Sequence, residues 1–126
     1  MLGEHALLRS TDAGEHFVGV ARPPLQSEGT VPTLTFANVR DGFAFMWGSG
    51  PLYVTHDGGQ SWHRAGPAGH VVSFALGGRE AYVVAGRVLE RSPVGRNAWR
   101  KLPVRVSRLP VSLAARGSNV WLLDPP

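Results

Sequence analysis

Apolar residues along this chain gather in short runs that recur at a nearly constant interval. Three segments read apolar, hydroxyl, bulky apolar and alanine, and they recur at 38 and then 39 residues: 34–37 (LTFA), 72–75 (VSFA) and 111–114 (VSLA). Each is followed by a turn and a second, almost wholly apolar run, at 43–47, 81–85 and 120–123. Gly or Pro interrupts nearly every window long enough for three helical turns, whereas short continuous apolar runs are typical of strands covered on both faces. The pattern therefore predicts an all-β chain.

Two further strands complete the repeating unit. A third apolar segment follows, at 52–55 and 88–91, and then a fourth that opens with Trp62 or Trp99 and mixes apolar with basic residues. Four strands in just under forty residues is the size of one β-propeller blade, a four-stranded antiparallel sheet. We predict one domain over residues 1–126 with about three blades: a half-blade at 6–21, complete blades at 33–66 and 70–103, and a half-blade at 110–124.

The turn between the third and fourth strands carries the most specific motif in the chain. The pattern Ser/Thr-x-Asp-x-Gly-x-Ser/Thr-Trp is matched at every defined position of 55–62, by Thr55, Asp57, Gly59, Ser61 and Trp62. Residues 10–17 match through Ser10, Asp12 and Gly14, with His16 replacing the second hydroxyl residue and Phe17 the Trp. A decayed copy at 92–99 keeps Ser92 and Trp99 but has Val94 and Arg96 at the Asp and Gly positions.

The residue types of the motif suit a tight turn. A short carboxylate such as Asp57 can accept hydrogen bonds from turn N–H groups that the strand ladder leaves free. Gly59 supplies the positive φ that such a turn demands. The Thr55 hydroxyl joins the same network, and Trp62 is expected to pack beneath the turn as an apolar plug.

On these motifs and the blade period, the chain resembles the Asp-box (BNR) repeat β-propellers. That family includes sialidases, sortilin-type receptors and photosystem II assembly factors of the HCF136/Ycf48 type. The resemblance implies that the boxes lie on the periphery of the ring, away from its axis. Asp12 and Asp57 are therefore expected to be structural, and we predict no catalytic residue among the box positions.

Three blades do not comfortably close a ring, because known propellers have about four to eight. Two interpretations follow. In the first, two copies join head to tail, the C-terminal inner strands of each pairing with the N-terminal hairpin of the other, and a six-bladed ring results. In the second, the sequence is a fragment of a longer propeller, and this interpretation is favoured because Asp-box propellers are usually encoded in one chain.

The charge distribution is uneven. The formal net charge is +4, carried by twelve Arg and Lys101, and eight of the Arg lie between Arg79 and Arg116, where only Glu80 and Glu90 oppose them. A basic half can attract nucleic acid or an anionic surface, or it can reflect a preference for Arg on solvated strand edges. No nucleic-acid motif accompanies the charge, so we expect no nucleic-acid partner.

The compartment is not determined by the sequence. The chain has no cysteine, which excludes disulfides and thiolate metal sites. No apolar run approaches the roughly 18 residues of a membrane helix, and residues 1–5 lack the features of a signal peptide. Analogy with the family nevertheless suggests an extracytoplasmic location.

Three classes of function come into question for such an architecture. The first is a non-catalytic binding or scaffold propeller that recognises a protein, through the Arg-rich half or aromatics such as Trp47 and Tyr53. The alternative is a fragment of a sialidase-like glycoside hydrolase, inactive alone because such a site draws on residues all around the ring. A metal site is the third, but no pair among the His residues, such as His56 and His63, has a recognised ligand spacing. We therefore predict no cofactor and no metal.

Overall fold

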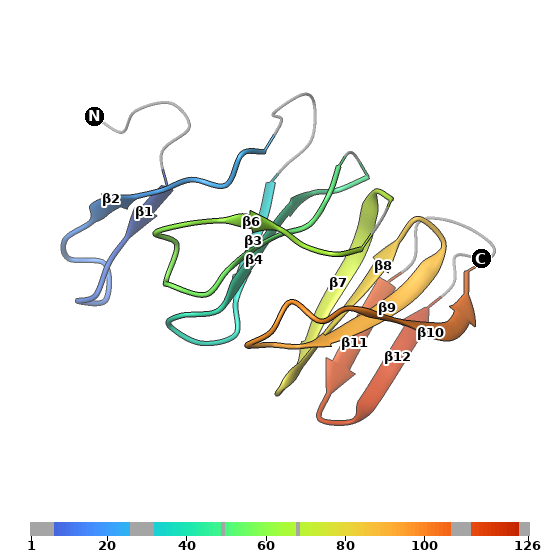
Figure 1. The fold of residues 1–126 in the computed structure, drawn as a ribbon. Coiled ribbons are helices and arrows are strands. Elements are labelled where there is room, and N and C mark those ends of the chain that lie inside the picture. Colours follow the sequence, from blue (N-terminus) through green and yellow to red (C-terminus); the bar gives the residue numbers. More distant parts are fainter. Residues whose placement is uncertain (1–6, 26–31, 49, 68, 107–111, 124–126) are drawn as a thin grey trace.

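The computed structural model describes residues 7–25, 32–48, 50–67, 69–106 and 112–123, and its described part is built from twelve β-strands and no helix (Figure 1). No helix that could cross a membrane occurs in these ranges. The strands are β1 (Leu7–Arg9), β2 (Val18–Val20), β3 (Pro32–Phe36), β4 (Gly42–Met46), β5 (Tyr53–Thr55), β6 (His63–Arg64), β7 (Val71–Gly77), β8 (Glu80–Ala85), β9 (Val88–Pro93), β10 (Arg100–Arg105), β11 (Ser112–Arg116) and β12 (Asn119–Leu123). Ala6, Pro110, Val111 and Asp124, which bound predicted segments, lie outside the described residues.

The strands form four antiparallel sheets that follow one another along the chain. Two sheets have four strands each, in the orders β3-β4-β5-β6 and β7-β8-β9-β10, and two are the hairpins β1-β2 and β11-β12. Every neighbour in a sheet is also a neighbour in sequence, as in a meander. Figure 1 shows the β1-β2 hairpin and the β11-β12 hairpin at opposite ends, with the two complete sheets between them. The predicted all-β architecture of four-stranded antiparallel blades flanked by half-blades is confirmed.

The core lies between the sheets. One apolar cluster joins the β3–β6 sheet to the β7–β10 sheet through side chains such as Phe43, Phe45 and Val83. A second cluster joins the β7–β10 sheet to the β11-β12 hairpin through Tyr82, Val84 and Leu113 and their neighbours. The inner strands of the middle sheets are covered on both faces: β4 is buried along its whole length and β8 along all but its first residue.

Strand β12 shows what happens when one covering sheet is absent. Its burial alternates along Asn119–Leu123, with Val120 and Leu122 packed against the β7–β10 sheet and Trp121 and Leu123 exposed on the other face. This is the period-2 pattern of a strand that is buried on one side only. The continuous apolar sequence of β12 therefore fits a strand covered on both faces, whereas the described residues cover only one.

The β11-β12 hairpin is seated on its neighbour by a close backbone approach. A Cβ built on Gly77 would lie 2.9 Å from the Gly117 carbonyl oxygen and 3.0 Å from the Ala115 Cβ, so only a residue without a side chain fits there. The approach brings the β7-β8 turn and the β11-β12 turn together. It fixes the position of the last half-blade relative to the complete blade before it.

Candidate functional site

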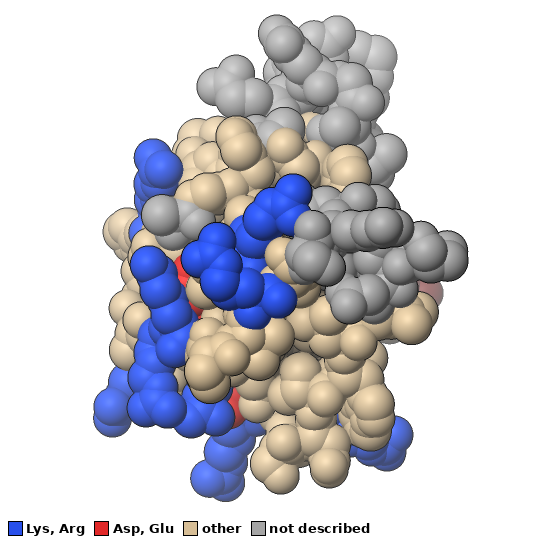
Figure 2. Space-filling model, turned by 90° about the vertical axis from the view of Figure 1, so that its right-hand side faces the viewer, with Lys and Arg blue, Asp and Glu red and all other residues tan. Residues whose placement is uncertain are grey.

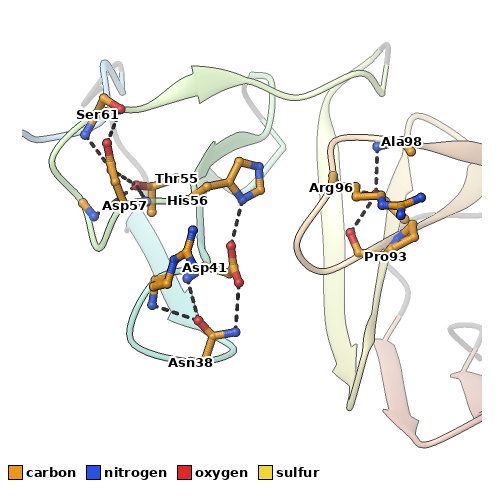
Figure 3. Close-up of polar contacts among 12 residues, drawn as sticks. Asn38, Asp41, Thr55, His56, Asp57, Ser61, Pro93, Arg96 and Ala98 are labelled. Carbon is orange, nitrogen blue, oxygen red and sulfur yellow. Dashed lines mark hydrogen bonds and ion pairs between the residues drawn. The ribbon is translucent and has the colours of Figure 1, made fainter.

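The turn at 55–62 is held by one carboxylate, on Asp57, and two hydroxyls, on Thr55 and Ser61 (Figure 3). The Thr55 hydroxyl donates to Asp57 Oδ1 at 2.7 Å and accepts from the Gly59 backbone N–H at 3.0 Å. Asp57 in turn accepts from the Ser61 backbone N–H at 2.9 Å and from the Ser61 hydroxyl at 2.5 Å. Gly58 and Gly59 have φ values of 72° and 95°, the left-handed region. The turn thus closes through side chains, because its amides have no ladder partners.

The turn at 10–17 repeats this network with one substitution. Ser10 donates to Asp12 Oδ1 at 2.8 Å and accepts from the Gly14 N–H at 2.8 Å. The His16 N–H donates to Asp12 Oδ1 at 2.9 Å, and His16 Nδ1 lies 2.6 Å from Asp12 Oδ2. The imidazole nitrogen therefore occupies the place that a hydroxyl takes in the other turn. The departure of His16 from the motif preserves the geometry.

Both carboxylates are strongly acidic for the same reason. The pKa of Asp57 is lowered from 3.8 to about 2 by hydrogen bonds from the Ser61 side chain and backbone and from Thr55. The pKa of Asp12 is likewise lowered to about 2, first by the backbone and side chain of His16 and then by Ser10. Hydrogen bonds to the ionised form favour that form. A carboxylate held in this way accepts turn hydrogen bonds and is poorly suited to donate a proton as a general acid.

The decayed turn at 92–99 is held differently. The Ser92 hydroxyl lies 2.7 Å from the Arg96 carbonyl oxygen and accepts from the Ala98 N–H at 3.0 Å (Figure 3). The hydroxyl thus satisfies the amide that the carboxylate satisfies at 55–62. Val94, at the Asp position, is 7% exposed and packs in the core cluster between the two complete sheets. Packing of the Val94 side chain in the core thus takes the place of the hydrogen bonds that the Asp57 carboxylate makes at 55–62.

The aromatic residue that closes each box turn reaches back toward the preceding sheet. Trp62 donates its Nε1–H to the Ala21 carbonyl at 2.9 Å, and it meets Phe36 edge-on with 6.2 Å between ring centroids. Trp99 meets Phe43 of the preceding sheet edge-on, with 6.5 Å between ring centroids. Phe17, with no described sheet before it, is 56% exposed. Trp62 and Trp99 therefore connect consecutive sheets. Phe17 has no preceding sheet to contact among the described residues.

Sequence reasoning missed a second polar network beside the 55–62 turn. Asn38 Oδ1 accepts from the backbone N–H groups of Arg40 and Asp41, and Asn38 Nδ2 donates to Asp41 Oδ2 at 2.9 Å. His56 Nδ1 lies 2.8 Å from Asp41 Oδ1 (Figure 3). Burial acts to raise the pKa of Asp41, but hydrogen bonds from His56 and Asn38 outweigh it and the pKa is lowered. The Asn-x-x-Asp spacing was the available signal for this turn.

An open groove of about 620 Å³ lies between the β1-β2 hairpin and the β3–β6 sheet. Apolar side chains from both sheets line it, among them Leu7, Val20, Leu34 and Phe36. Leu34 is 48% and Phe36 38% exposed. The groove holds no group of three or more metal-ligating side chains, and none occurs elsewhere in the described ranges.

Cations gather on the blade formed by β7–β10. Its exposed basic residues include Arg79, Arg96, Arg100, Lys101 and Arg105. Figure 2 shows Lys and Arg side chains gathered on one part of this end of the molecule, with few acidic side chains between them. The two acidic residues of the blade do little to offset them, since Glu80 lies 3.8 Å from Arg91 and Glu90 is buried. Burial raises the pKa of Glu90, although the charge of Lys101, its cross-strand neighbour, acts against the rise.

The tyrosines that a sialidase-type site would need are placed within the sheets. Tyr82 is 3% exposed and belongs to the core cluster beneath β11-β12. Tyr53 is half-buried on β5. Neither hydroxyl lies in the open groove.

The sheets and box turns define the class of protein, a segment of a β-propeller, and solved structures agree. The chain is similar to the structure described as "YCF48 bound to D1 peptide", with 22% sequence identity and a TM-score of 0.50 over 72% of this chain and 31% of that chain. It is also similar to "YCF48 from Cyanidioschyzon merolae", with 22% identity and a TM-score of 0.55 over 79% of this chain and 35% of that chain. The chain spans about a third of the length of these structures.

At this level of identity the similarity concerns the fold, and it confirms the predicted propeller architecture. A scan against family models finds no match, and a search of curated proteins finds none either.

Proposed function

We propose that this chain is a non-catalytic protein-recognition module whose binding surface is the basic blade β7–β10. The observation that carries the proposal is the concentration of exposed Arg and Lys on that blade, described above, with one acidic neighbour buried and the other beside Arg91. An excess of charge of one sign attracts a partner of the opposite sign and speeds its encounter. The partner that fits is an acidic segment of another protein.

Support for a protein partner also comes from the fold. Propellers present their loops and outer strands as recognition surfaces, and a fold alone does not specify chemistry. One of the similar structures is of YCF48 bound to a D1 peptide. By analogy, the binding of an extended protein segment is a use to which a propeller of this kind is suited.

The test is binding of a fluorescent Asp/Glu-rich peptide, followed by anisotropy. Reversing Arg100, Lys101 and Arg105 to Glu is expected to weaken binding by about tenfold or more, because each exposed charge pair contributes roughly 0.2–1 kcal/mol. A matched control reverses Arg22, Arg40 and Arg64, which are exposed cations outside this blade. Equal loss in both triple variants would contradict the proposal, since it would mean that only net charge matters.

A single-stranded oligonucleotide of equal charge separates protein recognition from polyanion binding. The proposal expects the peptide to bind more tightly than the oligonucleotide at physiological salt, where non-specific phosphate contacts are weakened. Tighter binding of the oligonucleotide would contradict the choice of a protein partner.

We also propose that the chain belongs to the Asp-box repeat family and acts outside the cytoplasm. The family assignment is supported by the repeated hydroxyl–carboxylate network at 10–17 and 55–62. The location rests on family analogy, and fractionation of producing cells tests it. A sialidase-type fragment is the competing function, and release of product from a fluorogenic sialoside by the purified chain would favour it.

A further inference from the structure

The dipeptide formed by Asp57 and Gly58 is of a kind that is chemically labile in a flexible chain. There, the backbone nitrogen of the glycine attacks Cγ of the aspartic acid side chain, and a C–N bond forms while the amide proton and the carboxyl OH leave as water. Glycine favours this attack because it has no side chain to obstruct it and its backbone reaches many conformations. The product is a five-membered succinimide. Water then opens the ring, and attack at the main-chain carbonyl carbon gives isoaspartate, whose backbone runs through the former side chain.

In the folded turn both oxygens of the Asp57 carboxylate accept hydrogen bonds (Figure 3). Oδ1 accepts from the Thr55 hydroxyl at 2.7 Å and from the Ser61 N–H at 2.9 Å, and Oδ2 accepts from the Ser61 hydroxyl at 2.5 Å. The Ser61 side chain and backbone, followed by Thr55, lower the pKa of Asp57 to about 2, because hydrogen bonds to the ionised form favour that form. An ionised carboxylate has no OH to lose as water. The hydrogen bonds of the turn therefore oppose the first step of the reaction.

The attacking nitrogen is held as well. The Gly58 N–H donates to the Arg40 carbonyl oxygen at 3.0 Å. Arg40 lies in the turn between β3 and β4, where its own N–H donates to Asn38 Oδ1 at 2.8 Å. Attack on Cγ requires the nitrogen to lose its proton and to turn toward the side chain, whereas the hydrogen bond to Arg40 retains the proton and fixes the peptide plane. Two neighbouring turns therefore restrain the two groups that would react.

The fold favours glycine at this position despite its chemistry. Gly58 has a φ of 72°, and a Cβ there would lie 3.1 Å from the Val39 carbonyl oxygen and 2.6 Å from an Arg9 side-chain nitrogen. The turn at 10–17 has Ala13 in the equivalent place, with a φ of 59°. The bond between Asp12 and Ala13 is less labile, because the alanine side chain obstructs the attack. Of the two box turns, the one at 55–62 therefore depends more on its hydrogen bonds for chemical stability.

We propose that the bond between Asp57 and Gly58 is a latent isoaspartate site, which the folded turn protects and which reacts only in molecules whose turn has opened. Folded proteins open locally, and turns open more readily than the core. Isoaspartate adds one methylene to the main chain and leaves the free carboxylate directly on Cα, so the hydrogen bonds to Thr55 and Ser61 cannot re-form in their old geometry. Each modified molecule is thereby a lasting record of an opening event. The proposal is independent of the acidic partner proposed above.

The first test compares the folded chain with an unstructured reference. The purified chain and a synthetic peptide of residues 53–64 are incubated side by side at neutral pH, well below the melting temperature of the chain. Isoaspartate at position 57 is then quantified by mass spectrometry. Conversion of the folded chain is expected to be slower by about tenfold or more, since a carboxyl with a pKa of about 2 instead of 3.8 is protonated about sixtyfold less often at neutral pH. A smaller difference overturns the proposal.

The second test removes one of the protecting hydrogen bonds. Ser61→Ala deletes the hydroxyl that donates to Asp57 Oδ2, at an exposed position. We expect isoaspartate to form about tenfold faster, because one hydrogen bond to a charged group shifts an equilibrium by about this factor. Ser61→Thr keeps the hydroxyl and is expected to keep the native rate, as is Ser112→Ala, which removes an exposed hydroxyl from another blade. An unchanged rate in Ser61→Ala, or an equal rise in either control, overturns the proposal.

The third test asks whether the modified turn can close again. The modified and unmodified forms of the native chain are separated by ion exchange after the same incubation, and their melting temperatures are compared. The isoaspartate form is expected to melt at a lower temperature, because the displaced carboxylate no longer accepts from Thr55 and Ser61. The unmodified fraction is the control for any other effect of the incubation. Equal melting temperatures would overturn the inference that modification records an opening that cannot be reversed.

Discussion

Two turns of this molecule occupy the same place in successive blades and are stabilised by different means. At 55–62 the carboxylate of Asp57, which is exposed, ties the chain to its own amides. At 92–99 Val94, which is buried in the core, stands at the position of the carboxylate, and the Ser92 hydroxyl accepts from the Ala98 N–H instead. What both turns keep is a fully buried hydroxyl at the first position, on Thr55 or Ser92. The comparison indicates that the hydroxyl is essential to the turn and the carboxylate replaceable.

The largest effect is expected from restoring the carboxylate where it was lost. Val94→Asp removes a core side chain and places a charge among apolar residues, and we expect the free energy of unfolding to fall by about 3 kcal/mol or more. Urea denaturation measures the change. Val39→Asp, at a site that is 73% exposed, is the control and is expected to cost under about 0.5 kcal/mol. If the two variants are equally stable, Val94 is not a core residue.

Removing the hydroxyl at the first position of the turn is expected to cause the next largest loss of stability, and a similar loss in both turns. Thr55→Val and Ser92→Ala each leave a backbone amide without its acceptor, the N–H of the buried Gly59 and of Ala98 respectively. We expect each to cost about 1–3 kcal/mol by chemical denaturation. Thr55→Ser keeps the hydroxyl and is the control. A cost confined to the 55–62 turn would show that the two hydroxyls are not equivalent.

The carboxylate of Asp57 should matter less, and its effect should depend on pH. Its folded pKa of about 2 lies below the ordinary 3.8, so the ionised form stabilises the fold at higher pH and this stabilisation is lost as the pH falls from about 3.8 to about 2. Asp57→Asn is expected to lower the melting temperature at pH 7 and to flatten the acid limb of the melting curve. An unchanged acid limb in Asp57→Asn would argue against the hydrogen bonds of Figure 3.

The smallest effect concerns the residue after each carboxylate. Ala13 has a φ of 59°, a conformation that costs an L side chain about 1 kcal/mol, while Gly58 has the same role at 72°. Ala13→Gly is expected to raise stability by about 0.5 kcal/mol, because relief of strain is partly offset by chain entropy. Gly58→Ala, whose Cβ would lie 3.1 Å from the Val39 carbonyl oxygen, should be destabilising. A loss of stability in Ala13→Gly would contradict this account.

The fold could be predicted from the sequence because its signals are local. The apolar runs that become β4 and β8 are covered on both faces, so their sequences read as strands without knowledge of their partners. The box residues are held by contacts within a few positions of one another, and spacing alone brings Thr55, Asp57 and Ser61 together. Local hydrogen bonding of this kind is visible in a single sequence.

What the sequence did not reveal depends on contacts between distant segments. The pairing of His56 with Asp41 joins two turns, and the acceptor of the Trp62 N–H is the carbonyl of Ala21, directly after strand β2 of another sheet. Val94 reads as decay of a motif, and only its neighbours in the core show that it took a new role. The location of the proposed binding surface was not predictable either, because a high Arg content predicts positive charge but not the blade on which it gathers.

The contact between the Trp that ends each box turn and the sheet before it has a consequence for folding. Trp62 and Trp99 both reach backward, so each blade is stabilised partly by the blade that follows it in the chain. Free energy is then shared between nearest neighbours, as in linear repeat proteins, and unfolding of one blade weakens the one before it. Cooperativity in this molecule is therefore local and reciprocal: loss of order in either of two adjacent blades removes the aromatic contact that stabilises both.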